Sequence, residues 1–127
     1  MDKKIIKTHK APQAIGPYSQ AVKSGNFIFA SGQIPLDPVS GNMIENDIKK
    51  QTERVMENIK GLLESENLTL SNVIKTTCYL SDMSNFAAFN EVYASYFTDD
   101  TPARSTVAVK SLPKDALVEV EITAVID

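Results

Sequence analysis

Cysteine and histidine are almost absent from this chain of 127 residues, which contains one of each. The single cysteine, Cys78, cannot form an internal disulfide bond, and a chain without disulfides is typical of a reducing compartment. The single histidine, His9, lies near the N-terminus, so neither a Ser-His-Asp triad nor a histidine-based metal site is expected. The sequence therefore predicts no metal centre.

Positive charge is also scarce, because 13 lysines and arginines are outnumbered by 16 aspartates and glutamates and the formal net charge is −3. Nucleic-acid-binding proteins usually have a clustered basic excess, so no nucleic-acid partner is expected. No apolar run approaches the roughly 20 residues that a membrane-spanning helix needs. The basic N-terminus is not followed by the apolar segment of a secretory signal. These absences predict a cytoplasmic protein without a membrane partner.

Apolar residues make up 43% of the sequence, which is sufficient for a hydrophobic core, and the length is typical of one domain. We expect residues 1–127 to form a single domain. Alternating or β-branched segments predict strands, and apolar residues at helical spacing predict helices. The predicted strands cover roughly residues 4–7, 20–24, 27–31, 73–80, 104–110 and 117–126, with helices after the third and fourth strands.

Capping residues define the two predicted helices. Asp47 is expected to cap the first helix, and Asn67 is expected to end it in a left-handed conformation. Ser84 is expected to cap the second helix. Its aromatic stripe consists of Phe86, Phe89, Tyr93 and Phe97. The order β-β-β-α-β-α-β-β predicts an α/β (α+β) fold, in which two helices pack on one face of a mixed sheet.

The alternation of the last two predicted strands indicates which side chains the helices cover. The final strand has one wholly apolar face, expected to lie under the helices, made of Val118, Val120, Ile122, Ala124 and Ile126. The same reasoning places Arg104, Thr106, Glu119 and Glu121 on the uncovered face. Such a mixed face suits an oligomer interface with polar pockets, so we expect the chain to oligomerise.

Arg104 is the main candidate for a ligand-binding residue. It begins a strand that is expected near the sheet centre, where a fixed guanidinium can bind a carboxylate through two hydrogen bonds. The alternative is a salt bridge to Glu119 or Glu121 of a neighbouring strand, and the residues alone slightly favour this alternative.

Five further residues are candidates with ordinary alternatives. Tyr18 is expected either to close a pocket or to anchor its own loop. Ser31 and Gly32 end a strand, where a glycine lets a ligand approach a free backbone N–H or simply lets the chain turn. Asn90 lies on the stripe of the second helix and is expected to be a satisfied core amide. Cys78 is expected to be a buried structural residue rather than a nucleophile.

Five segments point to one protein family: residues 14–20 (AIGPYSQ), 30–35 (ASGQIP), 89–93 (FNEVY), 102–105 (PARS) and 112–121 (LPKDALVEVE). In these segments the chain closely resembles the RidA (YjgF-type) family, and the resemblance extends over almost the whole chain. It implies a chorismate-mutase-like α/β fold and a homotrimer with pockets between subunits. It also implies that no cofactor is needed.

The resemblance further implies deaminase activity in metabolite damage control. The substrates would be reactive imine and enamine acids released by pyridoxal-phosphate dehydratases, such as 2-iminobutanoate and 2-iminopropanoate, and the products 2-keto acids and ammonia. By the matching segments, Arg104 is the catalytic residue that binds the substrate carboxylate, and Glu119 positions the attacking water. Ser31 and Gly32 would line the pocket, and Tyr18 would close it.

Thr106 departs from the family pattern, which usually has a cysteine two residues after the arginine. A role that depends on a thiol is therefore in doubt here. The threonine hydroxyl can still form a hydrogen bond to a ligand or to water, so Thr106 remains a candidate substrate-binding residue.

Two other functions use the same residues differently. In the first, the protein is a non-catalytic sensor or regulator that binds small 2-keto acids through Arg104. In the second, it is a ribonuclease or translation inhibitor, as some relatives have been described. The acidic balance and the single histidine argue against the second function.

Overall fold

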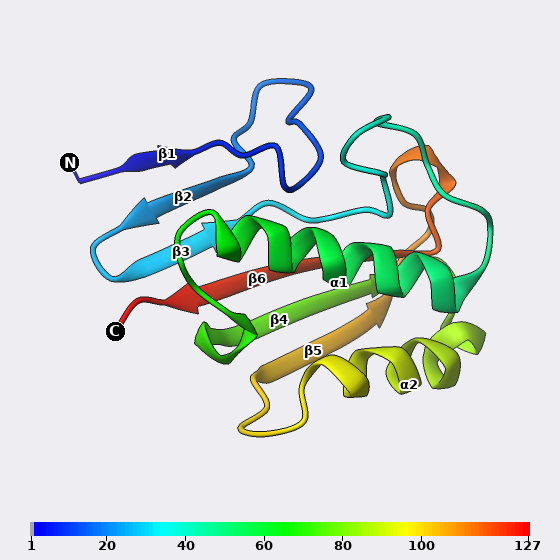
Figure 1. Ribbon diagram of the computed structural model, residues 1–127. Helices are drawn as coiled ribbons and strands as arrows, with labels where there is room; N and C mark the ends of the chain where they lie inside the picture. Colours follow the sequence, from blue (N-terminus) through cyan, green and yellow to red (C-terminus); the bar gives the residue numbers. More distant parts are fainter. Residues whose placement is uncertain (1) are drawn as a thin grey trace.

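The computed structural model describes residues 2–127, and its elements follow the predicted order (Figure 1). The strands are β1 (Lys4–Ile6), β2 (Ala21–Ser24), β3 (Phe27–Ala30), β4 (Val73–Leu80), β5 (Ala103–Ala108) and β6 (Val118–Val125). The α-helices are α1 (Ile48–Glu64) and α2 (Phe86–Tyr96). The short 3-10 helices are η1 (Leu70–Asn72), η2 (Met83–Asn85) and η3 (Pro113–Asp115).

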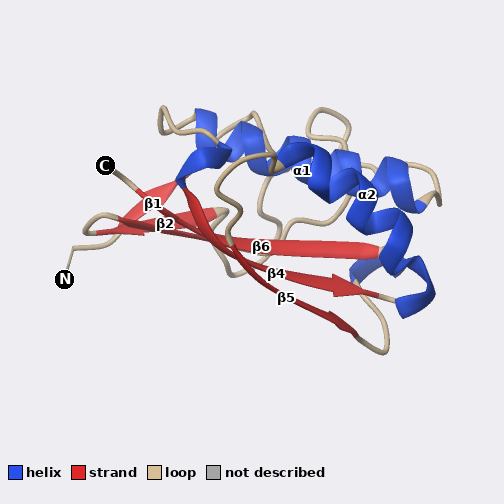
Figure 2. Cartoon of the chain, turned by 90° about the horizontal axis from the view of Figure 1, so that it is seen from below, coloured by secondary structure: helices blue, strands red, loops and turns tan. Residues whose placement is uncertain are grey.

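The six strands form one mixed sheet in the order β1-β2-β3-β6-β4-β5. β4 and β5 pair in parallel and are joined through α2, whereas the other pairs are antiparallel. Both helices lie on the same side of the sheet, and no helix of residues 2–127 covers the other side (Figures 1 and 2). The predicted α/β (α+β) class, with two helices on one face of a mixed sheet, is confirmed.

The ends of α1 agree with the predicted capping residues. The Asp47 carboxylate accepts a hydrogen bond from the Lys50 backbone N–H at 2.9 Å and so satisfies one of the free donors of the first turn. Asn67 adopts a left-handed conformation with φ of 60° in the turn that follows the helix. The helix itself ends at Glu64, three residues before this asparagine.

The start of α2 differs from the prediction. The side-chain cap belongs to η2 and is Asp82, whose carboxylate accepts a hydrogen bond from the Ser84 backbone N–H at 2.8 Å. Asn85 occupies the N-cap position of α2 without a side-chain capping bond. The prediction of Ser84 was wrong because η2 is inserted before the helix. The aromatic stripe is confirmed, since the ring centroids of Phe89 and Tyr93 are 5.5 Å apart in the core.

β6 lies between β3 and β4 and keeps the predicted alternation. Its core face is fully or almost fully buried and consists of Val118, Val120, Ile122 and Ala124. Glu119 and Glu121 project to the opposite face, which has no helix over it in the described chain. The same face exposes 43% of Phe27 and 48% of Phe29, the two aromatic residues of β3. For β6 the predicted faces are therefore correct.

β5 occupies the edge of the sheet rather than its centre, and its faces are the reverse of the prediction. In the parallel register Arg104 lies beside Thr76 and Thr106 lies beside Cys78. Register partners point to the same face, and Thr76 and Cys78 are buried in the core. Arg104 and Thr106 therefore lie on the helix side. Val107, which suggested the opposite assignment, is 45% exposed because both faces of this edge strand are only partly covered.

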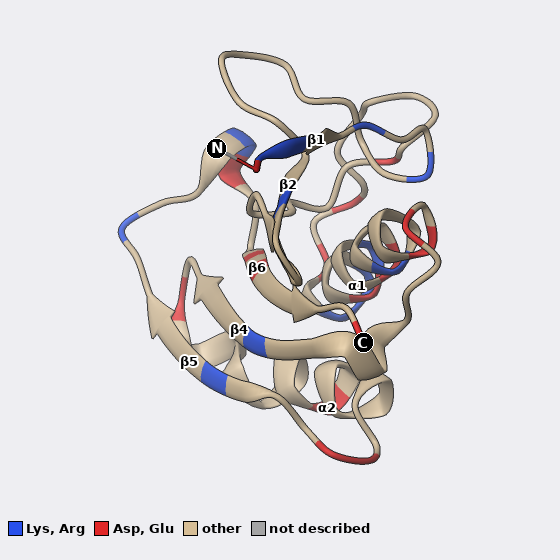
Figure 3. Cartoon of the chain, turned by 90° about the vertical axis from the view of Figure 1, so that its left-hand side faces the viewer, with Lys and Arg blue, Asp and Glu red and all other residues tan. Residues whose placement is uncertain are grey.

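The sheet curves from β1 and β2 round to β5, and α1 lies on its inner side (Figure 3). Acidic and basic segments both occur along α1 in this view. One of its basic residues, Lys49, extends its Nζ atom to within 2.9 Å of Glu91 Oε2 on α2 and so links the two helices. Within residues 2–127, no helix is both long enough and apolar enough to cross a bilayer.

A glycine in α1 allows the N-terminal segment to pass directly over the helix. A Cβ atom at Gly61 would lie 2.8 Å from the backbone carbonyl carbon of Lys10, which cannot move aside as a flexible side chain could. We expect Gly61→Ala to lower the free energy of unfolding by about 1–3 kcal/mol. This loss should appear although alanine favours a helix by about 1 kcal/mol over glycine. Urea unfolding followed by circular dichroism measures it.

Glu53→Ala is the matched control, because Glu53 is exposed on the same helix. Its free energy of unfolding should stay within about 0.5 kcal/mol of the wild-type value. An unchanged unfolding midpoint in Gly61→Ala would show that the segment around Lys10 is not held against α1.

Candidate active site

Arg104 is held at the sheet edge by side chains of α2. Its Nη1 atom donates a hydrogen bond to Asn90 Oδ1 at 2.6 Å, and its guanidinium carbon lies 4.8 Å from the ring centroid of Tyr93. The ring of Phe86 lies on another side, with its centroid 5.6 Å away. Cation–π contacts and one hydrogen bond thus fix the guanidinium while the residue remains exposed.

The alternative of a salt bridge to Glu119 or Glu121 is excluded by the topology. β5 pairs with β4, and β4 separates it from β6. Asn90 is likewise not the satisfied core amide that was expected, because it is only partly buried and accepts its hydrogen bond from Arg104. The structure brings these two candidate residues together.

Thr106 lies on the same face of β5 as Arg104. Its Oγ1 atom is buried and has no hydrogen-bond partner among residues 2–127. Buried hydroxyl groups are usually paired, and the neighbour of this one in the sheet register is the Cys78 thiol, a weak hydrogen-bonding group. Thr106 lies two residues along the strand from Arg104, and its role in binding a substrate stays a prediction.

Cys78 is a buried structural residue, as predicted. Burial raises the pKa of its thiol, which counteracts the formation of a thiolate. The Sγ atom lies 3.8 Å from Thr76 Oγ1 within the core.

Tyr18, Ser31, Gly32 and Glu119 line a second region, a cavity of about 580 Å³. Tyr18 forms part of the cavity wall, and 53% of this residue is exposed. Ser31 Oγ donates a hydrogen bond to the carbonyl of Ser19 at 2.6 Å, which fixes the loop below the tyrosine. These four predicted site residues therefore come together.

Gly32 is required by the position of Glu119. A Cβ atom on Gly32 would lie 2.8 Å from the carboxyl carbon of Glu119, so only a residue without a side chain lets this carboxyl group rest against the backbone. Within residues 2–127 the Gly32 N–H donates to no backbone or side-chain acceptor. The expected free N–H is therefore present.

Glu119 is the acidic residue of this cavity, and Glu121 projects from the same face of β6 two residues further on. Burial, and then the charge of Glu121, raise the pKa of Glu119 above its usual value. Glu121 accepts a hydrogen bond from the Tyr79 hydroxyl, and this bond is the main cause that raises the pKa of Tyr79 to about 12. Glu119 is thus able to exchange a proton closer to neutral pH than an exposed glutamate.

The predicted site residues form two groups that do not meet within one chain. We call Asn90, Arg104 and Thr106 the arginine half-site, and Tyr18, Ser31, Gly32 and Glu119 the glutamate half-site. β4 lies between their strands, so they are about 9–10 Å apart in the sheet plane alone. Arg104 also points to the helix side, whereas Glu119 points to the uncovered side.

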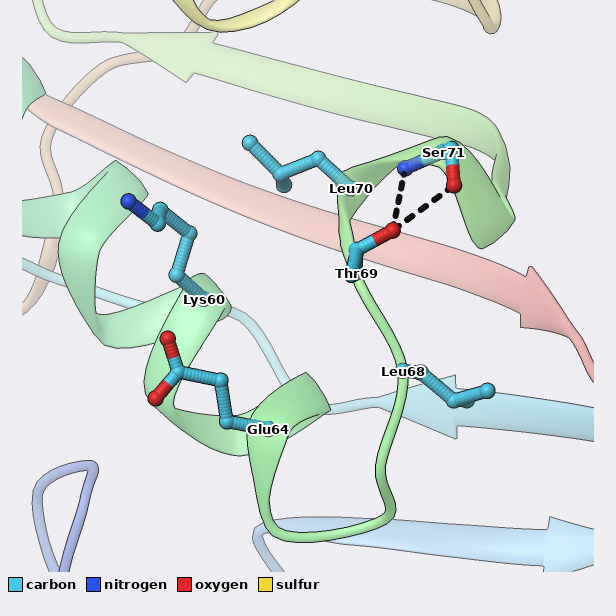
Figure 4. A pocket seen from close by; sticks show the side chains of 6 residues that line it. All are labelled: Lys60, Glu64, Leu68, Thr69, Leu70 and Ser71. Atoms are coloured by element: carbon cyan, nitrogen blue, oxygen red, sulfur yellow. Dashed lines mark hydrogen bonds between the residues drawn. The ribbon is translucent and has the colours of Figure 1, made fainter.

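Another cavity, of about 280 Å³, lies between the end of α1 and η1 (Figure 4). Lys60 and Glu64 of the helix line one wall of this cavity, and Leu68 and Leu70 belong to the segment that lines the opposite wall. None of the predicted site residues lines it. Within residues 2–127, no group of three or more histidine, cysteine, aspartate or glutamate side chains could hold a metal ion.

The sequence did not reveal two features of the site. One is the pair of rings around Arg104, although both belong to the predicted aromatic stripe of α2. The other is Lys114, which lines the cavity of the glutamate half-site together with Pro113. The turn that contains Lys114 was predicted, but the direction of its side chain depends on a left-handed backbone that a Pro-Lys-Asp sequence does not indicate.

The chain resembles known proteins over almost its whole length. Residues 8–126 match the family described as Endoribonuclease L-PSP. A RutC family protein of Pyrococcus abyssi is 55% identical over 124 residues, which cover 98% of this chain and 98% of that protein. The chloroplastic Reactive Intermediate Deaminase A of Arabidopsis thaliana is 43% identical over 122 residues, which cover 96% of this chain and 65% of that protein.

A solved structure extends the likeness to three dimensions. The crystal structure of E. coli TdcF with bound serine has a TM-score of 0.93 and 41% sequence identity to this chain. The alignment covers 98% of this chain and 99% of the other. By sequence and by fold, the chain therefore belongs to the RidA (YjgF-type) family, whose members also bear the names Endoribonuclease L-PSP and RutC.

Proposed function

We propose that this protein is a homotrimeric deaminase that hydrolyses small 2-imino acids, such as 2-iminobutanoate and 2-iminopropanoate, to 2-keto acids and ammonia. The observation that supports this most strongly is the state of Arg104. Its guanidinium is fixed by Asn90 and Tyr93, yet no carboxylate of residues 2–127 forms an ion pair with it. A fixed and unpaired guanidinium is suited to bind the carboxylate of a ligand.

A second copy of the chain would complete the site. The uncovered sheet face exposes Phe27, Phe29 and Val107, and exposed apolar side chains on one face are typical of a subunit interface. In the proposed trimer the uncovered faces lie around a common axis. The edge strand β5 of one subunit then brings its arginine half-site against the glutamate half-site of the next.

The proposed reaction needs few groups because the imine carbon is already electrophilic. Arg104 binds the carboxylate and thereby orients C2 of the substrate. The oxygen of a water molecule adds to C2, the nitrogen leaves as ammonia, and the oxygen remains as the keto group. Glu119, with its raised pKa, takes one proton from the attacking water and passes it to the imine nitrogen. As ammonia leaves, the second proton moves by the same route from the hydroxyl group of the tetrahedral intermediate to the nitrogen, and the keto group forms. The Gly32 N–H offers a hydrogen bond to the developing charge.

The names of two relatives support this proposal. One is a reactive intermediate deaminase, and the TdcF structure contains serine, a small molecule with an α-carboxylate. A bound amino acid is also compatible with the alternative function, a non-catalytic sensor or regulator that binds small carboxylates. Both functions would use Arg104, and only the deaminase would accelerate the decay of an imine. We place the activity in the cytoplasm, where the lone cysteine stays reduced.

Replacement of Arg104 tests the carboxylate contact. Arg104→Ala should lower kcat/KM for 2-iminobutanoate by about 100-fold, because a charge-assisted pair contributes up to about 3 kcal/mol. Arg104→Lys should have a kcat/KM between those of Arg104→Ala and the wild type, since an ammonium group cannot form the two parallel hydrogen bonds. The imine is produced by a dehydratase in the assay, and semicarbazide traps what the protein does not hydrolyse.

Lys7→Ala is the charge-matched control, because Lys7 is exposed and lies outside both half-sites. It should retain wild-type activity. Light scattering and circular dichroism verify that each variant is folded and assembled. Full activity in a well-folded Arg104→Ala trimer would refute the proposed role.

Replacement of Glu119 tests the proton transfer. Glu119→Gln should lower kcat/KM by about 100-fold and remove the rise of kcat/KM with pH that the ionisation of Glu119 produces. Because the folded-state pKa is raised, the charged form is disfavoured by folding at neutral pH. The same variant should therefore unfold at a higher urea concentration at pH 7, and this gain should disappear well below pH 4.5, the ordinary pKa.

A pH profile of wild-type activity that matches the profile of Glu119→Gln would contradict the role of Glu119. Tyr79→Phe is a useful control, since it removes the hydrogen bond to Glu121 and leaves the carboxyl group of Glu119 in place.

A further inference from the structure

Lys114 is the only lysine or arginine among the described residues that line the cavity of the glutamate half-site. The charged side chains of this lining are Lys114 and Glu119, and the other members are apolar or uncharged polar residues. Neither the deaminase nor the carboxylate sensor gives this lysine a role.

The backbone around Lys114 is held in an unusual conformation. Lys114 has φ of 55° and ψ of 27°, and the next residue, Asp115, also has φ of 55°. Non-glycine residues are disfavoured in this left-handed region, and such residues cluster at functional sites. The surrounding contacts must therefore stabilise this turn.

Those contacts fix the turn on both sides. The Asp115 N–H donates to the carbonyl of Leu112, and the Ala116 N–H donates to the carbonyl of Pro113, both at 3.1 Å. Ala116 is completely buried. The turn is thus a rigid support that places the lysine stem at the cavity.

A further hydrogen bond ties this support to α1. The Leu117 N–H donates to Oε1 of Gln51 at 2.9 Å, and this glutamine side chain is itself buried. The turn that carries Lys114 is therefore anchored to the core through α1.

The ammonium group of Lys114 has no ion-pair partner in the chain from residue 2 to residue 127. Glu119 lines the same cavity but its carboxyl group forms no ion pair with Lys114. A cation placed at a cavity without an internal counter-ion is complementary to an anionic ligand group.

The cavity also has room for more than a short aliphatic side chain. Its volume of about 580 Å³ is in the range of about 300–1,000 Å³ that holds drug-sized ligands. In the proposed trimer, the α-carboxylate of the substrate is bound by Arg104 of another subunit. The substrate side chain then extends into the cavity that Lys114 lines.

We infer that Lys114 binds an acidic group at the end of the substrate side chain, so that the substrates of this site include 2-imino dicarboxylic acids. This inference rests on the proposed function, because it assumes that Arg104 binds the α-carboxylate. It adds a specificity-determining residue to the site and names a class of substrate that the short aliphatic imino acids do not represent.

Binding of two stable keto acids tests this inference. 2-Oxoglutarate and 2-oxohexanoate have similar lengths, but only 2-oxoglutarate has an acidic side chain. Titration calorimetry of the assembled wild-type protein should show at least about tenfold tighter binding of 2-oxoglutarate. Lys114→Gln should abolish this preference and leave the Kd of 2-oxohexanoate within about twofold, and Lys114→Arg should preserve the preference.

Lys3→Gln makes the same change in net charge at an exposed position outside the cavity, and it should bind both keto acids like the wild type. Equal affinities of the wild type for the two keto acids, or an equal loss for both in Lys114→Gln, would overturn the inference. The proposed function is tested separately by the deamination of 2-iminobutanoate. Failure of that assay with a retained preference for 2-oxoglutarate would refute the deaminase and support the role of Lys114.

Discussion

The alternation of β6 is the constraint on which the rest of the molecule depends. This strand lies between β3 and β4, and its valines, isoleucine and alanine on one face are buried under the helices. The period of two then forces Glu119 and Glu121 onto the other face. A shift of the register by one residue would bury both carboxyl groups in the core. The alternation of side chains along β6 therefore determines both the buried core face and the position of the two acidic groups.

The sequence predicted those parts of the fold that depend on local pattern. The helix cap at Asp47, the left-handed Asn67 and the faces of β6 follow from residues that lie close together in the chain. The position of β5 does not, because it depends on a parallel pairing across the whole of α2. Both faces of β5 are partly covered, so its own alternation could not tell which side the helices occupy. The predicted face of Arg104 was wrong for this reason.

The site shows the same distinction between local and long-range information. The family segments placed Tyr18, Ser31, Gly32 and Glu119 in one site with Arg104 and Thr106. The first four line one cavity, and Arg104 and Thr106 lie outside it. The family segments could not reveal that the rings of α2 hold Arg104, or that a strained turn directs Lys114 to the cavity, because both depend on packing between distant segments. Close packing of Gly32 on Glu119 was likewise visible only in three dimensions.

The separation of the two half-sites has a consequence for regulation under the proposed function. Each chain carries its two half-sites on opposite sides of its sheet. The two half-sites of an isolated subunit therefore cannot contact the same substrate molecule. Catalysis would then depend on the protein concentration, and dilution below the dissociation constant of the trimer would abolish activity without unfolding the chain. A damaged copy would also silence a half-site of its neighbour, so that mixed assemblies would lose more activity than their share of defective chains.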